Sequence, residues 1–165
     1  MLHPEVKKLH MEQINKELYS AYLYLAIADY YADVNLNGFE NWFNIQAQEE
    51  RDHAMLFREY LNNQSERVHL TAVAGPEDDF KSFDEPLKTA LAHECGITAS
   101  IHNIYAVAFR EKDFRTMQFL DWFIKEQGEE EKSADNLVEK FKLFGTDAKS
   151  LYMLDNELAG RVYAP

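Results

Sequence analysis

The chain has 165 residues, which is the size of one domain and enough to build a sizeable hydrophobic core. Its formal net charge of −12 argues against binding to a phosphate backbone and is compatible with a cation as partner, although solubility alone is the simpler explanation of such a charge. Glycine (6 residues) and proline (4 residues) are scarce, which disfavours a β-sandwich and suits long helices.

Cysteine usage and the absence of long apolar runs bear on location. The one cysteine, Cys95, excludes an internal disulfide and fits a reducing cytoplasm, and we expect it to be a small buried residue. The N-terminal residues lack the apolar stretch of a signal peptide, and no segment approaches the roughly 18 apolar residues that span a membrane. We therefore expect a cytoplasmic protein without membrane or nucleic-acid partners.

The hydrophobic pattern predicts five helices and no strand, in a single domain over residues 1–165. The helices are expected at about 4–31, 37–62, 82–110, 114–144 and, for a short fifth one, 146–160. Their starts carry familiar signals, which are Pro4 in the first turn, the capping-box pairs Asn37/Glu40 and Ser82/Glu85, and Thr146 as an N-cap.

The connections decide how these helices are arranged. Links of a few residues make the first and second helices antiparallel neighbours, and likewise the third and fourth. The link between the second and third, roughly residues 63–81, is long enough to run beside a helix of about 26 residues, or roughly 39 Å. We therefore expect an all-α four-helix bundle with one long crossover, followed by a short fifth helix.

Each long helix has an apolar stripe, in alternating steps of three and four residues, that turns polar near its middle. In the antiparallel layout these polar levels can roughly coincide, so the side chains are expected to meet in one small volume of the core. The glutamates on the stripes are Glu17, Glu50, Glu94 and Glu130, accompanied by Gln46, His53 and Gln127.

Four carboxylates gathered in a core are strongly unfavourable unless a cation is present. Two divalent ions balance their charge, and oxygen ligands with one imidazole suit iron(II), manganese or zinc better than copper. Glu50 and His53 have the i, i+3 spacing that places both on one helix face, as in di-iron carboxylate bundles. One such pair is often a surface accident, and a misread stripe is the competing interpretation, but four mid-helix coincidences are hard to reconcile with it.

These residues resemble those of the ferritins, most closely the haem-free bacterial ferritins, and the resemblance covers essentially the whole chain. Three iron sites follow from the resemblance alone. The implied first site is Glu17, Glu50 and His53. The implied second site is Glu50, Glu94 and Glu130, with Gln127 nearby. The implied third site, of the bacterial kind, is Glu49, Glu126, Glu129 and Glu130.

The resemblance also implies a function. It implies a homo-oligomeric shell of 24 subunits that oxidises iron(II) with dioxygen or hydrogen peroxide and stores a ferric oxyhydroxide mineral. No haem is expected, because Arg51 and Asp52 lie where bacterioferritin has its haem-ligating methionine. Bacterioferritin also has a second Glu-x-x-His pair on the fourth helix, where this chain has Gln127 and Glu130 without a histidine.

Several residues leave alternatives open. Tyr24 matches the tyrosine beside the ferritin centre, where it can transfer an electron or hold a ligand, but it also reads as plain core. Glu49 is balanced between a third-site ligand and a solvated residue. His93 points away from the stripe and is expected at a surface or interface. Met117 and Leu120 stand where animal ferritins have the acidic residues of their iron channel, so the route of iron entry is not predicted.

Three other functions compete with the ferroxidase hypothesis. A storage shell without a competent oxidase is one, although the complete ligand set argues against it. A helical scaffold without metal is another, but it leaves four core glutamates unexplained. A dinuclear manganese or redox enzyme is compatible with the same ligand types.

Overall fold

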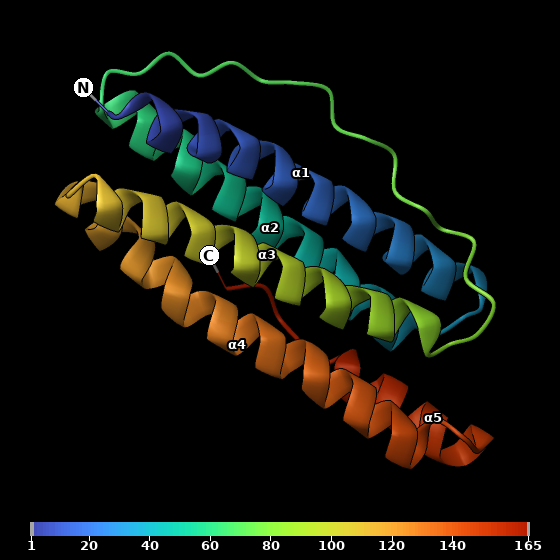
Figure 1. Ribbon diagram of the computed structural model, residues 1–165. Coiled ribbons are helices and arrows are strands. Elements are labelled where there is room, and N and C mark those ends of the chain that lie inside the picture. The colour runs from blue at the N-terminus through green and yellow to red at the C-terminus, as the bar shows by residue number, and fades with distance from the viewer. Residues whose placement is uncertain (1, 165) are drawn as a thin grey trace.

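The computed structural model describes residues 2–164, and within that range it contains five α-helices and no strand (Figure 1). Residues 1 and 165 of the expected domain lie outside the described part. The helices are α1 (Pro4–Asp33), α2 (Asn37–Asn63), α3 (Glu85–Arg110), α4 (Phe114–Phe144) and α5 (Ala148–Leu158). The expected fold class, a four-helix bundle with a short fifth helix, is confirmed.

The long segment between α2 and α3 runs along the outside of α1, so α2 and α3 are parallel as predicted (Figure 1). Polar contacts fix this crossover to α1. Asn15 Nδ2 donates to Thr71 Oγ1 at 2.8 Å and to the carbonyl of Ala72 at 3.0 Å, and Lys7 forms an ion pair with Glu66 at 2.7 Å. Side-chain contacts with α1 therefore hold the crossover in place, although it has no regular secondary structure of its own.

The apolar core is divided into two clusters, and the polar level lies between them along each long helix. One cluster surrounds Tyr31, Phe39 and Phe43 at the end of the bundle where α5 packs. The other surrounds Phe57 and Phe123 toward the opposite end. Tightly packed aromatic residues on both sides therefore hold the polar level in place along the bundle axis.

Helix α5 packs against the start of α2 and caps it. Asp155 Oδ1 accepts hydrogen bonds from the backbone N–H groups of Gly38 (2.8 Å) and Phe39 (3.1 Å). The expected capping box of Asn37 is therefore wrong: Leu36 is the N-cap residue, and its side chain makes no capping bond. A residue 117 positions away in sequence satisfies the free N–H groups instead.

Two further capping predictions are wrong. Helix α3 has Asp84 at its N-cap without a side-chain bond, and the Glu85 carboxylate accepts from the backbone N–H of Lys81 rather than of Ser82. Helix α5 is capped by Asp147, one residue after Thr146, through a 3.0 Å bond from the backbone N–H of Ser150. The carboxylate is the better cap because its charge also favours the helix N-terminus.

Cys95 is exposed, which contradicts the expectation of a buried thiol. Its neighbour Glu94 faces the bundle interior, and consecutive helical residues point about 100° apart, so Cys95 turns outward.

Candidate metal centre

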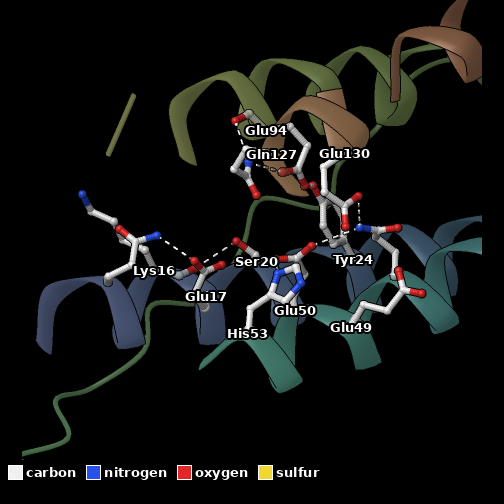
Figure 2. A network of polar contacts seen from close by, with 12 residues as sticks. Lys16, Glu17, Ser20, Tyr24, Glu49, Glu50, His53, Glu94, Gln127 and Glu130 are labelled. Atoms are coloured by element: carbon white, nitrogen blue, oxygen red, sulfur yellow. Dashed lines mark hydrogen bonds and ion pairs between the residues drawn. The ribbon is translucent and has the colours of Figure 1, made fainter. Parts of the chain in front are cut away.

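The four stripe glutamates converge between the two apolar clusters, one from each long helix (Figure 2). The heptad spacing of the flanking apolar residues turns each of them inward, and none is more than 7% exposed. The converging glutamates are Glu17 on α1, Glu50 on α2, Glu94 on α3 and Glu130 on α4, and His53 on α2 lies beside them.

Two overlapping groups of ligand atoms are present in this cluster. Glu17, Glu50 and His53 each offer one atom, and these atoms lie within 4.8 Å of one another. Glu50, Glu94 and Glu130 do the same. Glu50 belongs to both groups, so one carboxylate is placed to bridge two neighbouring ions. The structure thus brings together the residues expected for the first and second iron sites, while their role as ligands stays a prediction.

One atom on each of three residues has been left without a hydrogen-bond partner. These buried atoms are Glu17 Oε2, Glu50 Oε2 and His53 Nδ1. The second oxygen of each carboxylate is already used, since Glu17 Oε1 accepts from Gln13 at 2.7 Å and Glu50 Oε1 accepts from Gln46 at 3.0 Å. Two of these atoms, Glu50 Oε2 and His53 Nδ1, lie 3.4 Å apart, too far for a good hydrogen bond but close enough to share an ion. Buried polar atoms rarely lack hydrogen bonds in a folded protein, so the set points to a cation with oxygen and imidazole ligands.

The electrostatics of the cluster favour either bound protons or bound cations. Burial raises the pKa of Glu17 well above its usual value, and the nearby charge of Glu50 adds to the effect. Burial likewise raises the pKa of Glu50, with help from Glu94 and Glu130. Burial, followed by the charge of Glu94, raises the pKa of Glu130 to about 8. Divalent ions that enter the cluster must therefore displace protons, and two of them balance four carboxylates.

Glutamine amides provide most of the surrounding hydrogen bonds. Gln46 Nε2 donates to Glu50 and, at 2.7 Å, to Glu130 Oε2, as its place on the stripe suggested. Gln127 Nε2 donates to Glu94 Oε2 at 3.1 Å, so in this geometry its nitrogen supports a carboxylate. Gln13 had no assigned role, although it precedes Glu17 by four residues just as Gln46 precedes Glu50. That repeated Gln-x-x-x-Glu spacing is the signal that could have found it.

Tyr24 is buried and donates its hydroxyl hydrogen to Glu94 Oε1, which links α1 to α3 across the cluster. Burial, together with the charge of Glu94, raises the pKa of Tyr24, so the phenol remains a neutral donor. His93 is half-buried inside the same chain: Ser20 Oγ donates to the carbonyl of Lys16 and lies 2.7 Å from His93 Nε2. Its contact with Ser20 lies within one chain, and the expected surface or interface role of His93 stays a prediction.

The comparisons with known proteins agree with this geometry. The family profile described as a ferritin-like domain matches residues 7–144. The chain belongs to the ferritin family. It is 39% identical over 155 residues to the bacterial non-heme ferritin of Campylobacter jejuni, covering 94% of this chain and 93% of that protein. It is 34% identical over 163 residues to that of Staphylococcus haemolyticus, covering 99% of this chain and 98% of that protein.

Solved ferritin structures superpose closely on this ferritin chain. An engineered closed form of the Archaeoglobus fulgidus ferritin has a TM-score of 0.97 at 40% identity, covering 99% of this chain and all of that one. A humanized archaeal ferritin has a TM-score of 0.98 at 38% identity, with both chains fully covered.

Among the described residues, no helix is long and apolar enough to cross a membrane.

The residues expected to form a third iron site in this ferritin do not all meet. Glu126 and Glu130 offer atoms within 4.8 Å of each other and of His53. Glu49 instead forms a 2.6 Å ion pair with Arg161 in the C-terminal tail, which the sequence had not suggested. Glu129 is largely exposed and pairs with Lys125 on the helix surface at 3.3 Å. The third iron site that the resemblance implies therefore stays a prediction. Of the three glutamates that belong to this site alone, Glu126 is the one that lies close to His53 and Glu130.

The early part of α4 differs from an acidic channel in this ferritin. Leu120 is fully buried in the second apolar cluster, and Met117 is partly buried. Asp121 is exposed and accepts a hydrogen bond from Tyr105 at 3.0 Å. Met117 and Leu120 thus provide no pair of carboxylates one turn apart, and the buried Leu120 does not reach the surface.

Proposed function

We propose that this ferritin oxidises iron(II) at the buried cluster and stores the ferric product inside a homo-oligomeric shell. Family membership supports iron storage in general. The buried cluster of glutamates supports the more specific proposal that the protein oxidises iron(II). The single observation behind it is the pair of ligand groups that share Glu50, with three buried atoms left free for a cation. A structural role alone does not explain four buried carboxylates of which two, Glu17 and Glu50, each keep one oxygen without a hydrogen bond.

The chemistry follows from the pairing of the two sites. Two iron(II) ions bound side by side each give up one electron, and dioxygen takes both electrons with two protons and leaves as hydrogen peroxide. Hydrogen peroxide in place of dioxygen is reduced to two water molecules by the same two electrons and two protons. Because the electrons move as a pair, one-electron reduced oxygen is not released. Carboxylates stabilise iron(III) more than iron(II), so the cluster also makes the oxidation more favourable.

Named side chains have separate tasks in this proposal. Glu50 bridges the two ions, and His53 supplies the one nitrogen ligand. Glu17 completes the first site, whereas Glu94 and Glu130 complete the second. Tyr24 donates to Glu94 and holds its carboxylate in place. We assign Gln127 to the same supporting task, because its nitrogen faces Glu94.

The assembly belongs to the proposal as well. We propose the ferritin shell of 24 subunits, a ferric oxyhydroxide mineral and a cytoplasmic location, all by relationship to the family. Exposed apolar side chains on α1, among them Tyr22 and Leu25, support burial between copies of the chain. No haem ligand is assigned.

The test is the initial rate of iron(II) oxidation, followed by the absorbance of iron(III). Glu50→Ala is expected to fall to the slow rate of iron oxidation in buffer, because both sites lose a ligand. Glu59→Ala, an exposed glutamate on the same helix, is the matched control and is expected to keep the wild-type rate. Equal rates in wild type and Glu50→Ala would remove Glu50 from the centre. A wild type that oxidises iron no faster than buffer but still fills with mineral would instead indicate storage without an oxidase.

A further inference from the structure

The C-terminal tail, residues 159–164, turns back after α5 and lies on the middle of α2. Figure 1 shows the tail after α5, in red, running back toward the middle of the bundle. Asn41 on α2 fixes this turn by donating to the carbonyls of Leu158 (3.3 Å), Ala159 (3.4 Å) and Arg161 (3.1 Å). The tail is therefore held close to the polar level by α2 itself.

Arg161 makes four contacts with one face of α2. Its Nη2 pairs with Glu49 Oε2 at 2.6 Å, and its Nη1 donates to Gln46 Oε1 at 3.0 Å and to the carbonyl of Trp42 at 3.2 Å. Its guanidinium carbon lies 4.3 Å from the centre of the Trp42 ring. A planar cation that is stacked and paired on several sides has a fixed position, unlike a surface lysine.

Arg161 reaches the metal centre through a single amide group. Because Gln46 Oε1 accepts from Arg161, the nitrogen of that amide must face the opposite way. There it donates to Glu50 Oε1 and Glu130 Oε2. Arg161 on one side and the two carboxylates on the other thus favour the same orientation of the Gln46 amide, and Arg161 contacts no proposed ligand of the first two ions.

An open groove leads from the surface to the cluster, and the tail forms one of its walls. Its lining includes Glu49, His53 and Glu126 from the helices and Tyr163 from the tail. The tyrosine hydroxyl donates to Asp52 on α2. At the inner end lies the group of His53, Glu126 and Glu130, where His53 Nδ1 is buried and unpaired. Glu126 belongs to that group, and Glu49 lines the same groove, so an ion leaving the cluster this way passes both carboxylates.

We propose that Arg161 is a positioning residue whose charge acts on this groove through Glu49, which lines the groove and pairs with Arg161. Its ion pair keeps Glu49 from metal ions, so a third ion gains Glu49 as a ligand only when Arg161 leaves. The same side chain keeps Gln46 turned toward the cluster. The inference rests on the proposed function of the cluster and adds a control over ion passage between the cluster and the groove.

The experiment is a titration of the assembled, metal-free protein with Co²⁺. Calorimetry measures the affinities, and the visible absorption of bound Co²⁺ reports on its ligands. Wild type is expected to bind two ions tightly per chain and a third weakly. Arg161→Ala is expected to bind the third ion roughly fivefold more tightly, the factor that corresponds to a partly exposed ion pair. The double variant Arg161→Ala/Glu49→Gln is expected to lose this gain, because the freed ligand is gone.

Control variants separate the charge of Arg161 from its part in holding the tail. Arg161→Met keeps the apolar stem over Trp42 but lacks the charge, and it is expected to show the same gain even where alanine loosens the tail. Arg161→Lys restores the charge and is expected to return the third affinity toward wild type. Lys140→Ala removes a surface ion pair with Glu157 between α4 and α5, and it is expected to leave all three affinities unchanged.

The outcomes distinguish this inference from the proposed function. Two tight ions in wild type with an unchanged third affinity in both Arg161→Ala and Arg161→Met would overturn the role of Arg161 alone. A gain that persists in the double variant would show that Glu49 is not the ligand set free, and would overturn it too. Failure of wild type to bind two tight ions would contradict the centre itself.

Discussion

Gln46 on α2 donates an amide hydrogen to Glu130 Oε2 on α4 at 2.7 Å, and both side chains are buried. The same nitrogen donates to Glu50 Oε1, four residues further along α2. Gln13 serves Glu17 in the same way on α1. In each helix the glutamine uses one carboxylate oxygen and leaves the other, Oε2, without a partner. The glutamines therefore select which carboxylate oxygen stays available to the proposed metal ions, which is how groups around a site orient its ligands.

Replacing Gln46 tests this selection. Gln46→Leu keeps much of the volume but removes the donor, so Glu50 and Glu130 lose their fixed orientation. We expect the affinity for the two tight Co²⁺ ions to fall about 10- to 100-fold, as for other groups that orient ligands. Calorimetric titration measures the change, and Gln118→Leu on the exposed side of α4 is the control. Wild-type affinity in Gln46→Leu would show that the glutamine only fills space.

Tyr24 offers a second test on the other side of the cluster. Tyr24→Phe removes the hydroxyl that donates to Glu94 but keeps the ring, which packs against Phe43 at 5.8 Å between centroids. We expect one of the two Co²⁺ ions to bind about tenfold more weakly, because Glu94 belongs to only one ligand group. Iron oxidation slows with it, since both ions must be present together.

The control for this test is Tyr152→Phe, an exposed tyrosine on α5. It is expected to bind both ions and to oxidise iron as wild type does. Equal loss of both ions in Tyr24→Phe would mean that the hydroxyl supports the whole bundle rather than the second site.

Much of the centre could be predicted from the sequence because it depends on local periodicity. Glu17, Glu50 and His53 lie on apolar stripes, and a stripe tells which way a side chain points once the helix is recognised. The long crossover then placed the four helices relative to one another. These two rules need no knowledge of contacts between distant residues, which is why the fold and the converging glutamates were foreseen together.

The contacts that were missed join residues far apart in sequence. Asp155 caps α2 from 117 residues away, and Arg161 meets Glu49 from 112 residues away. Both depend on how α5 and the tail dock on the bundle, and no short-range pattern encodes that docking. The capping box of Asn37 failed for the same reason, because Asp155 from another helix takes the place of the local side chain. The box of Ser82 and Glu85 failed locally, because Glu85 accepts from Lys81 and Ser82 donates to Asp84.

The close approach of α5 to α2 predicts a sensitive glycine. A β-carbon at position 38 would lie 1.7 Å from the backbone oxygen of Asp155, so Gly38→Ala must push α5 away and weaken the cap on α2. We expect a loss of about 1–3 kcal/mol in the free energy of unfolding, measured as a lower thermal midpoint. Gly96→Ala is the matched control: nothing lies within 4 Å of its β-carbon, and alanine favours a helix by up to about 1 kcal/mol. A midpoint unchanged in Gly38→Ala would show that α5 can shift freely.

The buried carboxylates predict that the metal-free protein loses stability as the pH rises from 7 to about 8. Burial raises the pKa of Glu130 from 4.5 to about 8, so in this interval the folded chain holds a proton that the unfolded chain has released. The free energy of unfolding therefore falls by up to about 1.4 kcal/mol per pH unit for each such proton. Below pH 4.5 both states are protonated and the effect vanishes. Thermal midpoints of wild type and Glu130→Gln, which stays neutral, are expected to converge as the pH falls. Saturating Zn²⁺ should abolish the decline in wild type, because the ion replaces the protons. If the midpoint of the metal-free wild type instead rose between pH 7 and 8 relative to that of Glu130→Gln, the protonated cluster would be contradicted.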